Sequence, residues 1–218
     1  MIFCRLDLYF FPILDIYTPI DRTILGYKEL FSPIRRFSMK KAAVIHDLSG
    51  FGKCSLTAAI PVLSALGVQC CPVATAVLTG QTGYPCYHCT DLTAMLPDYI
   101  DAWGKNNAHF DAIYSGFLTG AKQISQVLDF IRYFREEHTL LLVDPVMGDD
   151  GNAYPFFTPG LLNGMKELTL EADVITPNLT EACLLADIPE DALLHCRTNT
   201  DLLKLAEDVA QRLQKKVP

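Results

Sequence analysis

Residues 140–151, which read LLLVDPVMGDDG, decide the fold. The first four residues are apolar, a pattern typical of a short strand buried on both faces of a sheet. The run ends at Asp144-Pro145, because proline has no N–H to donate and keeps the preceding residue out of helix. Asp149 and Asp150 follow between two glycines. A carboxylate at a strand end, followed by an acidic loop, suits a hard cation with phosphate attached. Aspartates that only form turns are the alternative, and this stretch alone leaves both explanations open.

Around this stretch, apolar strand-like segments alternate with helix-like segments. The expected strands are 42–45, 68–78, 111–115, 140–143 and 173–176, and the expected helices are 55–66, 91–104, 122–137, 161–170, 178–186 and 201–215. This alternation predicts an α/β fold with a mainly parallel sheet covered on both faces. Ligands of such sheets lie beyond the carboxyl ends of the strands, where the glycine-bearing loops 46–53, 79–84 and 116–120 also lie.

The composition limits the class of protein. A chain of 218 residues is long enough for one sizeable domain, and 50% hydrophobic with 20% charged residues indicates a globular protein. The net charge of -7, without a block of lysine or arginine, argues against a nucleic-acid-binding surface. It does not argue against a phosphorylated ligand, because a metal ion can reconcile an acidic site with phosphate.

The eight cysteines are scattered, and most lie among apolar residues, where free cysteine behaves as a small hydrophobe. Because no signal peptide precedes them, we expect a reducing cytoplasm. Cys86 and Cys89 are the one pair with metal or redox spacing, and without a second pair such a role ranks last.

Residues 1–38 do not match the rest of the chain. They are rich in aromatic and aliphatic residues, and Pro12, Pro19 and Pro33 interrupt every possible helix. Acidic residues break the apolar runs before the roughly 18 residues of a membrane span. Since Met39 directly precedes a strand, we interpret 1–38 as an upstream extension without a folded role and 39–218 as the folded domain.

Residues 49–55, SGFGKCS, fit neither common nucleotide motif. A P-loop needs glycine where Asp47 stands and serine or threonine where Cys54 stands. A dinucleotide fingerprint needs glycine in place of Ser55 and an acid about 20 residues further on. Residues 48–90 contain no aspartate or glutamate.

Residues 176–181, TPNLTE, lie where a strand meets a helix. Asn178 and Glu181 share the first helical turn, which predicts a capping box. A helix N-terminus also favours phosphate, and Glu181 can hold a metal-bound water. The two interpretations are compatible, and Asp144 at the neighbouring strand end favours adding the metal.

Four motifs in this order resemble the pyridoxal (vitamin B6) kinase branch of the ribokinase-like superfamily: 81–84 (QTGY), 114–117 (YSGF), 143–149 (VDPVMGD) and 175–181 (ITPNLTE). The likeness extends from Met39 to about Lys215. It implies a three-layer ribokinase-like fold and ATP-dependent phosphorylation of the hydroxymethyl group of pyridoxal, pyridoxamine or pyridoxine. Kinases acting on hydroxymethylpyrimidine share the Asn-x-x-Glu motif and are the close alternative.

The resemblance assigns roles on the nucleotide side. Asp144 and Glu181 are expected to hold Mg²⁺, and a monovalent cation such as K⁺, through waters. Asp149 is expected near the phosphates of ATP, and Thr176 and Asn178 are expected to line the nucleotide.

On the substrate side, the resemblance implies contacts from Asp47, Ser49, Thr82, Gly83 and Phe117. Thr82 would touch the pyridine ring, and Phe117 would stack on it or shield it. Asp47 stands where the family often has serine. A carboxylate there could pair with a protonated ring nitrogen or with a substrate amine, which would suit pyridoxamine.

The sequence departs from the family in one respect. Such kinases carry a late Gly-x-Gly-Asp segment that supplies an anion hole and the catalytic base, and nothing after Glu181 resembles it. We therefore expect residues 39–218 to form a partial kinase domain, incomplete at the C-terminus, with the base beyond Pro218 and little or no turnover. The alternatives to a kinase are a non-catalytic ligand-binding remnant and a truncated product without function. The expected partner is a small molecule rather than nucleic acid or membrane, and full-length family members are expected to be homodimers.

Overall fold

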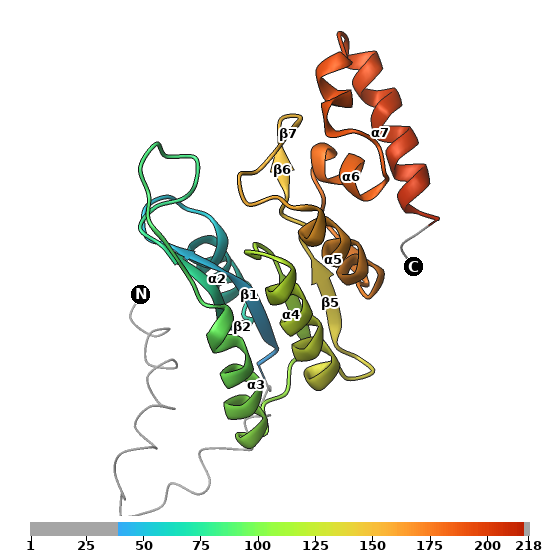
Figure 1. Ribbon diagram of the computed structural model, residues 1–218. Helices are drawn as coiled ribbons and strands as arrows, with labels where there is room; N and C mark the ends of the chain where they lie inside the picture. Colours follow the sequence, from blue (N-terminus) through green and yellow to red (C-terminus); the bar gives the residue numbers. More distant parts are fainter. Residues whose placement is uncertain (1–38, 216–218) are drawn as a thin grey trace, which may run out of the picture. The chain divides into compact units, whose positions relative to one another are not determined.

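The computed structural model describes residues 39–215, so the interpretation of 1–38 lies outside the described residues. The strands are β1 (Lys41–Ser49), β2 (Gln69–Leu78), β3 (Cys89–Asp91), β4 (Ala112–Ser115), β5 (Leu140–Val143), β6 (Gly148–Asp149), β7 (Asn152–Ala153) and β8 (Val174–Ile175) (Figure 1). The α-helices are α2 (Ser55–Ala65), α3 (Leu96–Lys105), α4 (Ala121–Phe134), α5 (Pro159–Leu170), α6 (Leu179–Leu185) and α7 (Asn199–Leu213), and the 3-10 helices are η1 (Thr93–Met95) and η2 (Glu190–His195).

The central sheet has six strands in the order β3-β2-β1-β4-β5-β8. All neighbouring pairs are parallel except β2 with β3. Crossover connections between parallel strands bring the carboxyl ends of β1, β2, β4, β5 and β8 to one edge of the sheet. The predicted α/β fold with a mainly parallel sheet is therefore confirmed.

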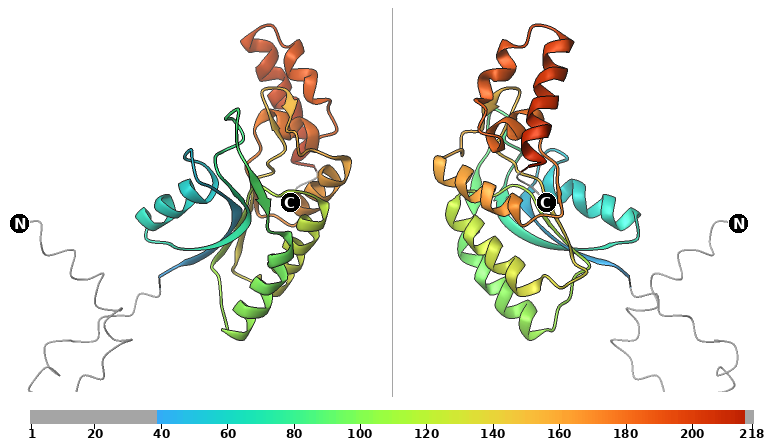
Figure 2. Two further views of the ribbon diagram at one scale, coloured as in Figure 1. Left: turned by 60° about the vertical axis from the view of Figure 1, so that its left-hand side comes forward. Right: turned by 90° about the vertical axis from the view of Figure 1, so that its right-hand side faces the viewer.

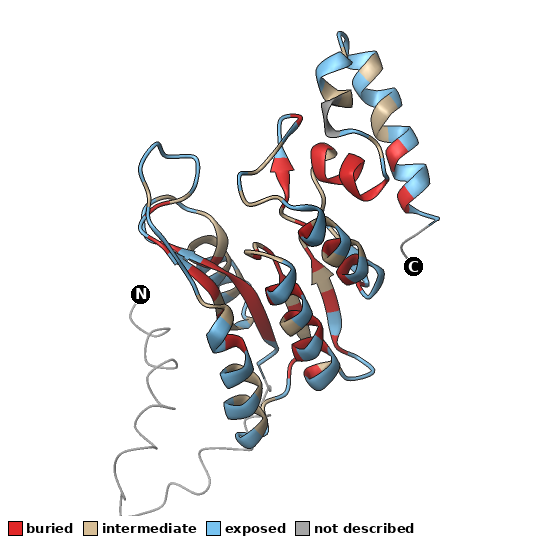
Figure 3. Ribbon diagram, viewed as in Figure 1, coloured by how far each residue is buried: buried red, intermediate tan, exposed pale blue. Residues whose placement is uncertain are grey.

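Helices cover both faces of the sheet. Helix α2 packs on one face, and α3, α4 and α5 cover the other (Figure 2). Alternate residues of β1 point to opposite faces: Ala42 and Val44 pack with α2, whereas Ala43 and Ile45 belong to the larger core. All four are at most 4% exposed, so the centre of the sheet is buried on both sides (Figure 3).

The strand β5 is buried more on one face than on the other. Leu141 and Val143 are fully buried, whereas Leu140 is 46% exposed and Leu142 is intermediate. The expectation of burial on both faces is thus correct only for the face that packs against the helices. Within residues 39–215, no helix is both long and apolar enough to cross a bilayer.

Several boundaries differ from the expected ones. The strand β1 continues to Ser49 because a bulge between His46 and Leu48 keeps it paired with β2, so part of the expected loop 46–53 is strand. The expected helix 91–104 begins only at Leu96, since Asp91 still pairs with β2. The hairpin β6–β7 and the helix η2 are too short to produce a periodic sequence signal.

Candidate active site

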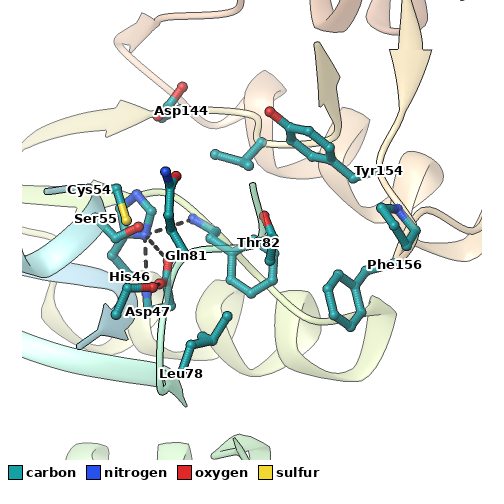
Figure 4. A pocket seen from close by; sticks show the side chains of 14 residues that line it. His46, Asp47, Cys54, Ser55, Leu78, Gln81, Thr82, Asp144, Tyr154 and Phe156 are labelled. Atoms are coloured by element: carbon teal, nitrogen blue, oxygen red, sulfur yellow. Dashed lines mark hydrogen bonds and ion pairs between the residues drawn. The ribbon is translucent and has the colours of Figure 1, made fainter. Parts of the chain in front are cut away.

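A pocket of about 270 Å³ lies at the carboxyl edge of the sheet (Figure 4). Its lining comes from the ends of β1, β2 and β5, the start of α2, the loops that follow β2 and β4, and the segment 154–156. The lining residues are His46, Asp47, Ser49, Cys54, Ser55, Leu78, Gln81, Thr82, Phe117, Asp144, Val146, Tyr154, Pro155 and Phe156. This volume is near the lower end of the range for small-molecule sites, so the pocket suits a ligand of about one ring.

Asp47 and His46 form a buried pair at one side of the pocket, with Tyr154 and Phe156 across from them (Figure 4). The Nδ1 atom of His46 lies 2.9 Å from Oδ1 of Asp47, and the Ser49 hydroxyl donates to Oδ2 at 2.8 Å. The β1 bulge lies between His46 and Leu48, at the position of this pair, and bulges commonly re-aim side chains next to binding sites.

The carboxylate of Asp47 is ionised more easily than an ordinary aspartate. Burial alone would raise its pKa, but hydrogen bonds from His46, Ser55 and Ser49 outweigh that effect and hold the pKa below 3.8. A carboxylate with these partners is an anion fixed in position.

Of the five predicted substrate-side residues, the structure brings four together. Asp47, Ser49, Thr82 and Phe117 all line the pocket, whereas Gly83 lies outside its lining. Gln81 and Thr82 are the members of that loop that line the pocket, and an added Cβ at Gly83 would meet only the Gln81 side chain.

Asp144 lies at the end of β5, on the edge of the same pocket. The Thr176 hydroxyl donates to its Oδ1 at 3.3 Å, because β5 and β8 are neighbours and their ends meet. Burial raises the pKa of Asp144, and the nearby His46 and the Thr176 hydroxyl oppose that shift.

Glu181 is 4% exposed and lies close to Asp144. Its Oε2 accepts the Asn178 N–H at 2.9 Å, and its Oε1 accepts the Met147 N–H at 3.2 Å. Burial raises its pKa to about 7, and the negative charge of Asp144 adds to that shift. A bound cation would stabilise the charge of Glu181, which burial and the nearby Asp144 both disfavour.

The predicted capping box is present. Asn178 Oδ1 accepts the Glu181 N–H at 3.0 Å, and Asn178 Nδ2 donates to the Gly148 carbonyl at 2.8 Å. Asn178 thus connects α6 to the acidic loop. Asp149 in that loop is exposed, and its Oδ1 accepts the N–H of Asp150.

The carboxylates of Asp144 and Glu181 fit a magnesium site that has few protein ligands. Within the described part of the chain, no lysine or arginine ion pair involves Asp144, Asp149 or Glu181, and no group of three or more potential metal-ligating side chains occurs. Mg²⁺ commonly takes one or two carboxylates and completes its shell with water and phosphate oxygens. Asp144 and Glu181 match that requirement, and the roles of Asp144, Asp149, Thr176, Asn178 and Glu181 toward ATP stay predictions.

Sequence reasoning missed part of the pocket. His46, Cys54, Ser55, Leu78, Val146, Tyr154, Pro155 and Phe156 were not assigned to a site. The segment 154–156 could have been found, since proline and aromatics directly after an acidic loop suit a pocket wall.

None of the seven cysteines in residues 39–215 forms a disulfide, and Cys86 and Cys89 are exposed.

The α/β fold, with its site at the carboxyl ends of parallel strands, is that of a ribokinase-like kinase. The sequence model of the family described as phosphomethylpyrimidine kinase matches residues 52–217. The chain belongs to this family, and the relatives below join it to the pyridoxal kinases, as the motifs predicted.

Three known proteins illustrate the similarity. A pyridoxine/pyridoxal/pyridoxamine kinase of Bordetella avium is 34% identical over 143 residues, which cover 62% of this chain and 47% of that enzyme. A Bacteroides thetaiotaomicron protein, provisionally assigned as a phosphomethylpyrimidine kinase, superposes with a TM-score of 0.72 and 42% identity, over 82% of this chain and 61% of that one. A second crystal form of that protein was solved with pyridoxal.

Pyridoxal kinase from Lactobacillus plantarum superposes with a TM-score of 0.68 and 31% identity, over 80% of this chain and 60% of that one. The chain therefore spans less than two thirds of the length of each of these relatives.

Proposed function

We propose that this protein binds a B6 vitamer and acts in the transfer of the γ-phosphoryl group of ATP to its hydroxymethyl group. The observation that carries the proposal is the position of Asp144. Its carboxylate lines the pocket, and it is near enough to the buried Glu181 for its charge to act on that carboxyl group. A substrate hydroxyl in the pocket would therefore be next to the two carboxylates that suit Mg²⁺.

The residues divide the work of phosphoryl transfer, which consists mainly of positioning and of neutralising charge. Asp144 and Glu181 would hold Mg²⁺, which supplies the charge that stabilises the phosphates when bound. Asp149, Thr176 and Asn178 would lie toward the nucleotide, with a monovalent cation such as K⁺ nearby. On the substrate side, Thr82 and Phe117 would contact the ring, with Ser49 and Asp47 at the end of β1.

We expect the 218-residue chain to bind ligand but to turn over little, because no Gly-x-Gly-Asp segment follows Glu181. The test is to incubate the protein with MgATP and each of pyridoxal, pyridoxamine and pyridoxine, and to detect the phosphate ester by mass spectrometry. Calorimetric binding of the same ligands is measured in parallel. Binding with little product supports the proposal, fast product formation contradicts the expectation of low turnover, and absence of binding contradicts the proposed substrate class.

Phosphorylation of a hydroxymethylpyrimidine is the second candidate, because the matching family model carries that description. The pyrimidine is added to the same panel as a fourth ligand. Tighter binding of the pyrimidine than of every B6 vitamer would favour this candidate. Vitamer binding that neither MgATP nor Mg²⁺ affects would favour a ligand-binding protein without kinase activity.

We also propose a cytoplasmic location and, by analogy with the full-length family, self-association as a homodimer. Sedimentation velocity at several concentrations tests the second point, since a sedimentation coefficient that stays at the monomer value contradicts it.

A further inference from the structure

The pocket carries two carboxylates and no opposing permanent cation. Among its lining residues, which all lie within 39–215, Asp47 and Asp144 are acidic, His46 is the one imidazole, and neither lysine nor arginine occurs. In a concave site with restricted water, each charge acts more strongly on a ligand than it would at a surface. Asp144 faces the proposed metal, which leaves Asp47, with His46 as its one basic neighbour in the lining, as the carboxylate available to a ligand.

Asp47 has the geometry of a fixed ligand-binding carboxylate. It is 5% exposed and lines the pocket, and its two oxygens are held by His46 and Ser49 at 2.9 Å and 2.8 Å. Two carboxylate oxygens offer about four acceptor sites, so these contacts leave capacity for a further donor. The pKa of Asp47 lies below its ordinary value because hydrogen bonds from His46, Ser55 and Ser49 outweigh burial, so the group is an anion at neutral pH.

His46 is in turn held by the end of β4. Its ring packs so closely on Gly116 that an added Cβ there would overlap the imidazole. The ring also meets Tyr114 edge-on with a centroid separation of 6.1 Å. The packing against Gly116 and Tyr114 therefore holds the ring of His46 beside Asp47 on the side that faces β4.

We propose that Asp47, held in place by the positioning residue His46, makes the pocket selective for ligands that present a positively charged N–H donor. This inference rests on the proposed function and specifies its substrate class. The shared chemistry is a cationic nitrogen. It can come from the protonated ring nitrogen of a hydroxymethylpyridine or from the ammonium of an aminomethyl substituent. A neutral ring of the same shape gives the Asp47 carboxylate no cationic partner from the ligand.

A purely structural explanation exists for the same contacts. Asp47 could serve only to connect His46 and Ser49 across the β1 bulge, in which case its loss would weaken every ligand equally. The experiment must therefore measure selectivity rather than affinity alone.

The test measures calorimetric affinities of the full chain for three ligands, without nucleotide. The ligands are pyridoxamine, pyridoxine, which has a hydroxyl in place of the ammonium, and the carbocyclic analogue of pyridoxine, which has carbon in place of the ring nitrogen. In the wild type, we expect at least one step of this series to change affinity by about tenfold or more, the range for a hydrogen bond to a charged group. In Asp47→Asn, the ratio of the two affinities at that step should approach one.

The pattern identifies the source of the charge. If only the difference between pyridoxine and its carbocyclic analogue disappears in Asp47→Asn, the partner is the ring nitrogen. If only the difference between pyridoxamine and pyridoxine disappears, the partner is the ammonium. Wild-type ratios near one, or ratios that Asp47→Asn leaves unchanged, would overturn the inference. Failure of the wild type to bind all three ligands would instead contradict the proposed function.

Two further variants separate positioning and folding effects. His46→Gln removes the imidazole but keeps a side-chain amide N–H, so we expect an intermediate loss of selectivity with an unchanged circular dichroism spectrum; unchanged selectivity would exclude the positioning role. Asp101→Asn makes the same chemical change at an exposed aspartate of α3 that pairs with Lys105, and it should leave all three affinities unchanged.

Discussion

At the residue scale, the pocket depends on close packing around His46. Its imidazole lies within contact of Asp47 in β1 and of Gly116, which directly follows β4, the neighbour of β1 in the sheet. Sequence reasoning assigned Asp47 from the family resemblance but gave no role to His46. The reason is physical: nothing in a single sequence indicates that the residue before Asp47 turns back onto the next strand, because the β1 bulge and the parallel register decide that.

Gly116→Ala should destabilise the protein through overpacking. An added Cβ would overlap the buried ring of His46 and force it to shift, and such overpacking costs about 1–3 kcal/mol. Gly120→Ala is the matched control, since no atom lies within 4 Å of a Cβ added there. Urea unfolding monitored by circular dichroism measures both variants. Equal stability of Gly116→Ala and Gly120→Ala would show that the His46 side chain can shift without cost.

Asp47 should contribute to stability at neutral pH but not in acid. Its pKa in the folded protein is lowered from 3.8, so the native state favours the carboxylate. The corresponding stability is present above the unfolded pKa and is lost as the pH falls through the lower folded pKa. Between about pH 6 and pH 3, the wild type should therefore lose more free energy of unfolding than Asp47→Asn. Parallel urea-unfolding curves for the two proteins over this range would contradict the assignment.

At the scale of elements, the short helix α6 connects the sheet edge to the acidic loop. All of its residues from Thr180 to Leu185 are buried, and its cap residue Asn178 also bonds to Gly148. The capping box could be predicted because Asn-x-x-Glu has a local physical basis. The bond from Asn178 to Gly148 could not, since it joins segments 30 residues apart.

Asn178→Ala should destabilise the protein by about 1–2 kcal/mol, since it removes both the cap of α6 and the bond to Gly148. Asn178→Ser keeps a capping oxygen and loses only the second bond, so its cost should be smaller. Thermal unfolding of both variants measures the difference. If Asn178→Ser destabilises the protein as much as Asn178→Ala, the cap contributes nothing to stability. The bond from Asn178 to Gly148 would then account for the whole effect.

Also at this scale, the regular elements were more predictable than their ends. The strand β5 and the helix α4 have strong apolar patterns, and they lie within a few residues of the expected positions. The two-residue strands β6 and β7 and the antiparallel strand β3 depend on tertiary pairing rather than on local periodicity. This matters for the site, because the β6–β7 hairpin is the segment of sequence that connects Asp144 to Tyr154 in the pocket wall.

At the scale of the whole molecule, the parallel sheet explains why residues far apart in sequence meet. Asp47 lies near the carboxyl end of β1 and Asp144 directly follows β5, and these strand ends lie on one edge with β4 between them. Glu181 joins them from α6 beside β8. The sheet order was not predictable from the strand pattern alone, whereas the location of the site at the carboxyl edge was. The chain spans about three fifths of its solved relatives, so activity of the isolated chain is a separate question from ligand binding.

We propose above all that Asp144 and Glu181 share one Mg²⁺ beside the phosphates of ATP. The most direct measurement is calorimetric binding of ATP with and without Mg²⁺ to the wild type, Asp144→Asn, Glu181→Gln and the double variant. The account predicts that Mg²⁺ strengthens ATP binding to the wild type, that each single variant loses most of this gain, and that the double variant loses little more, because the two groups act on one ion. A gain from Mg²⁺ that persists in both single variants would contradict the claim.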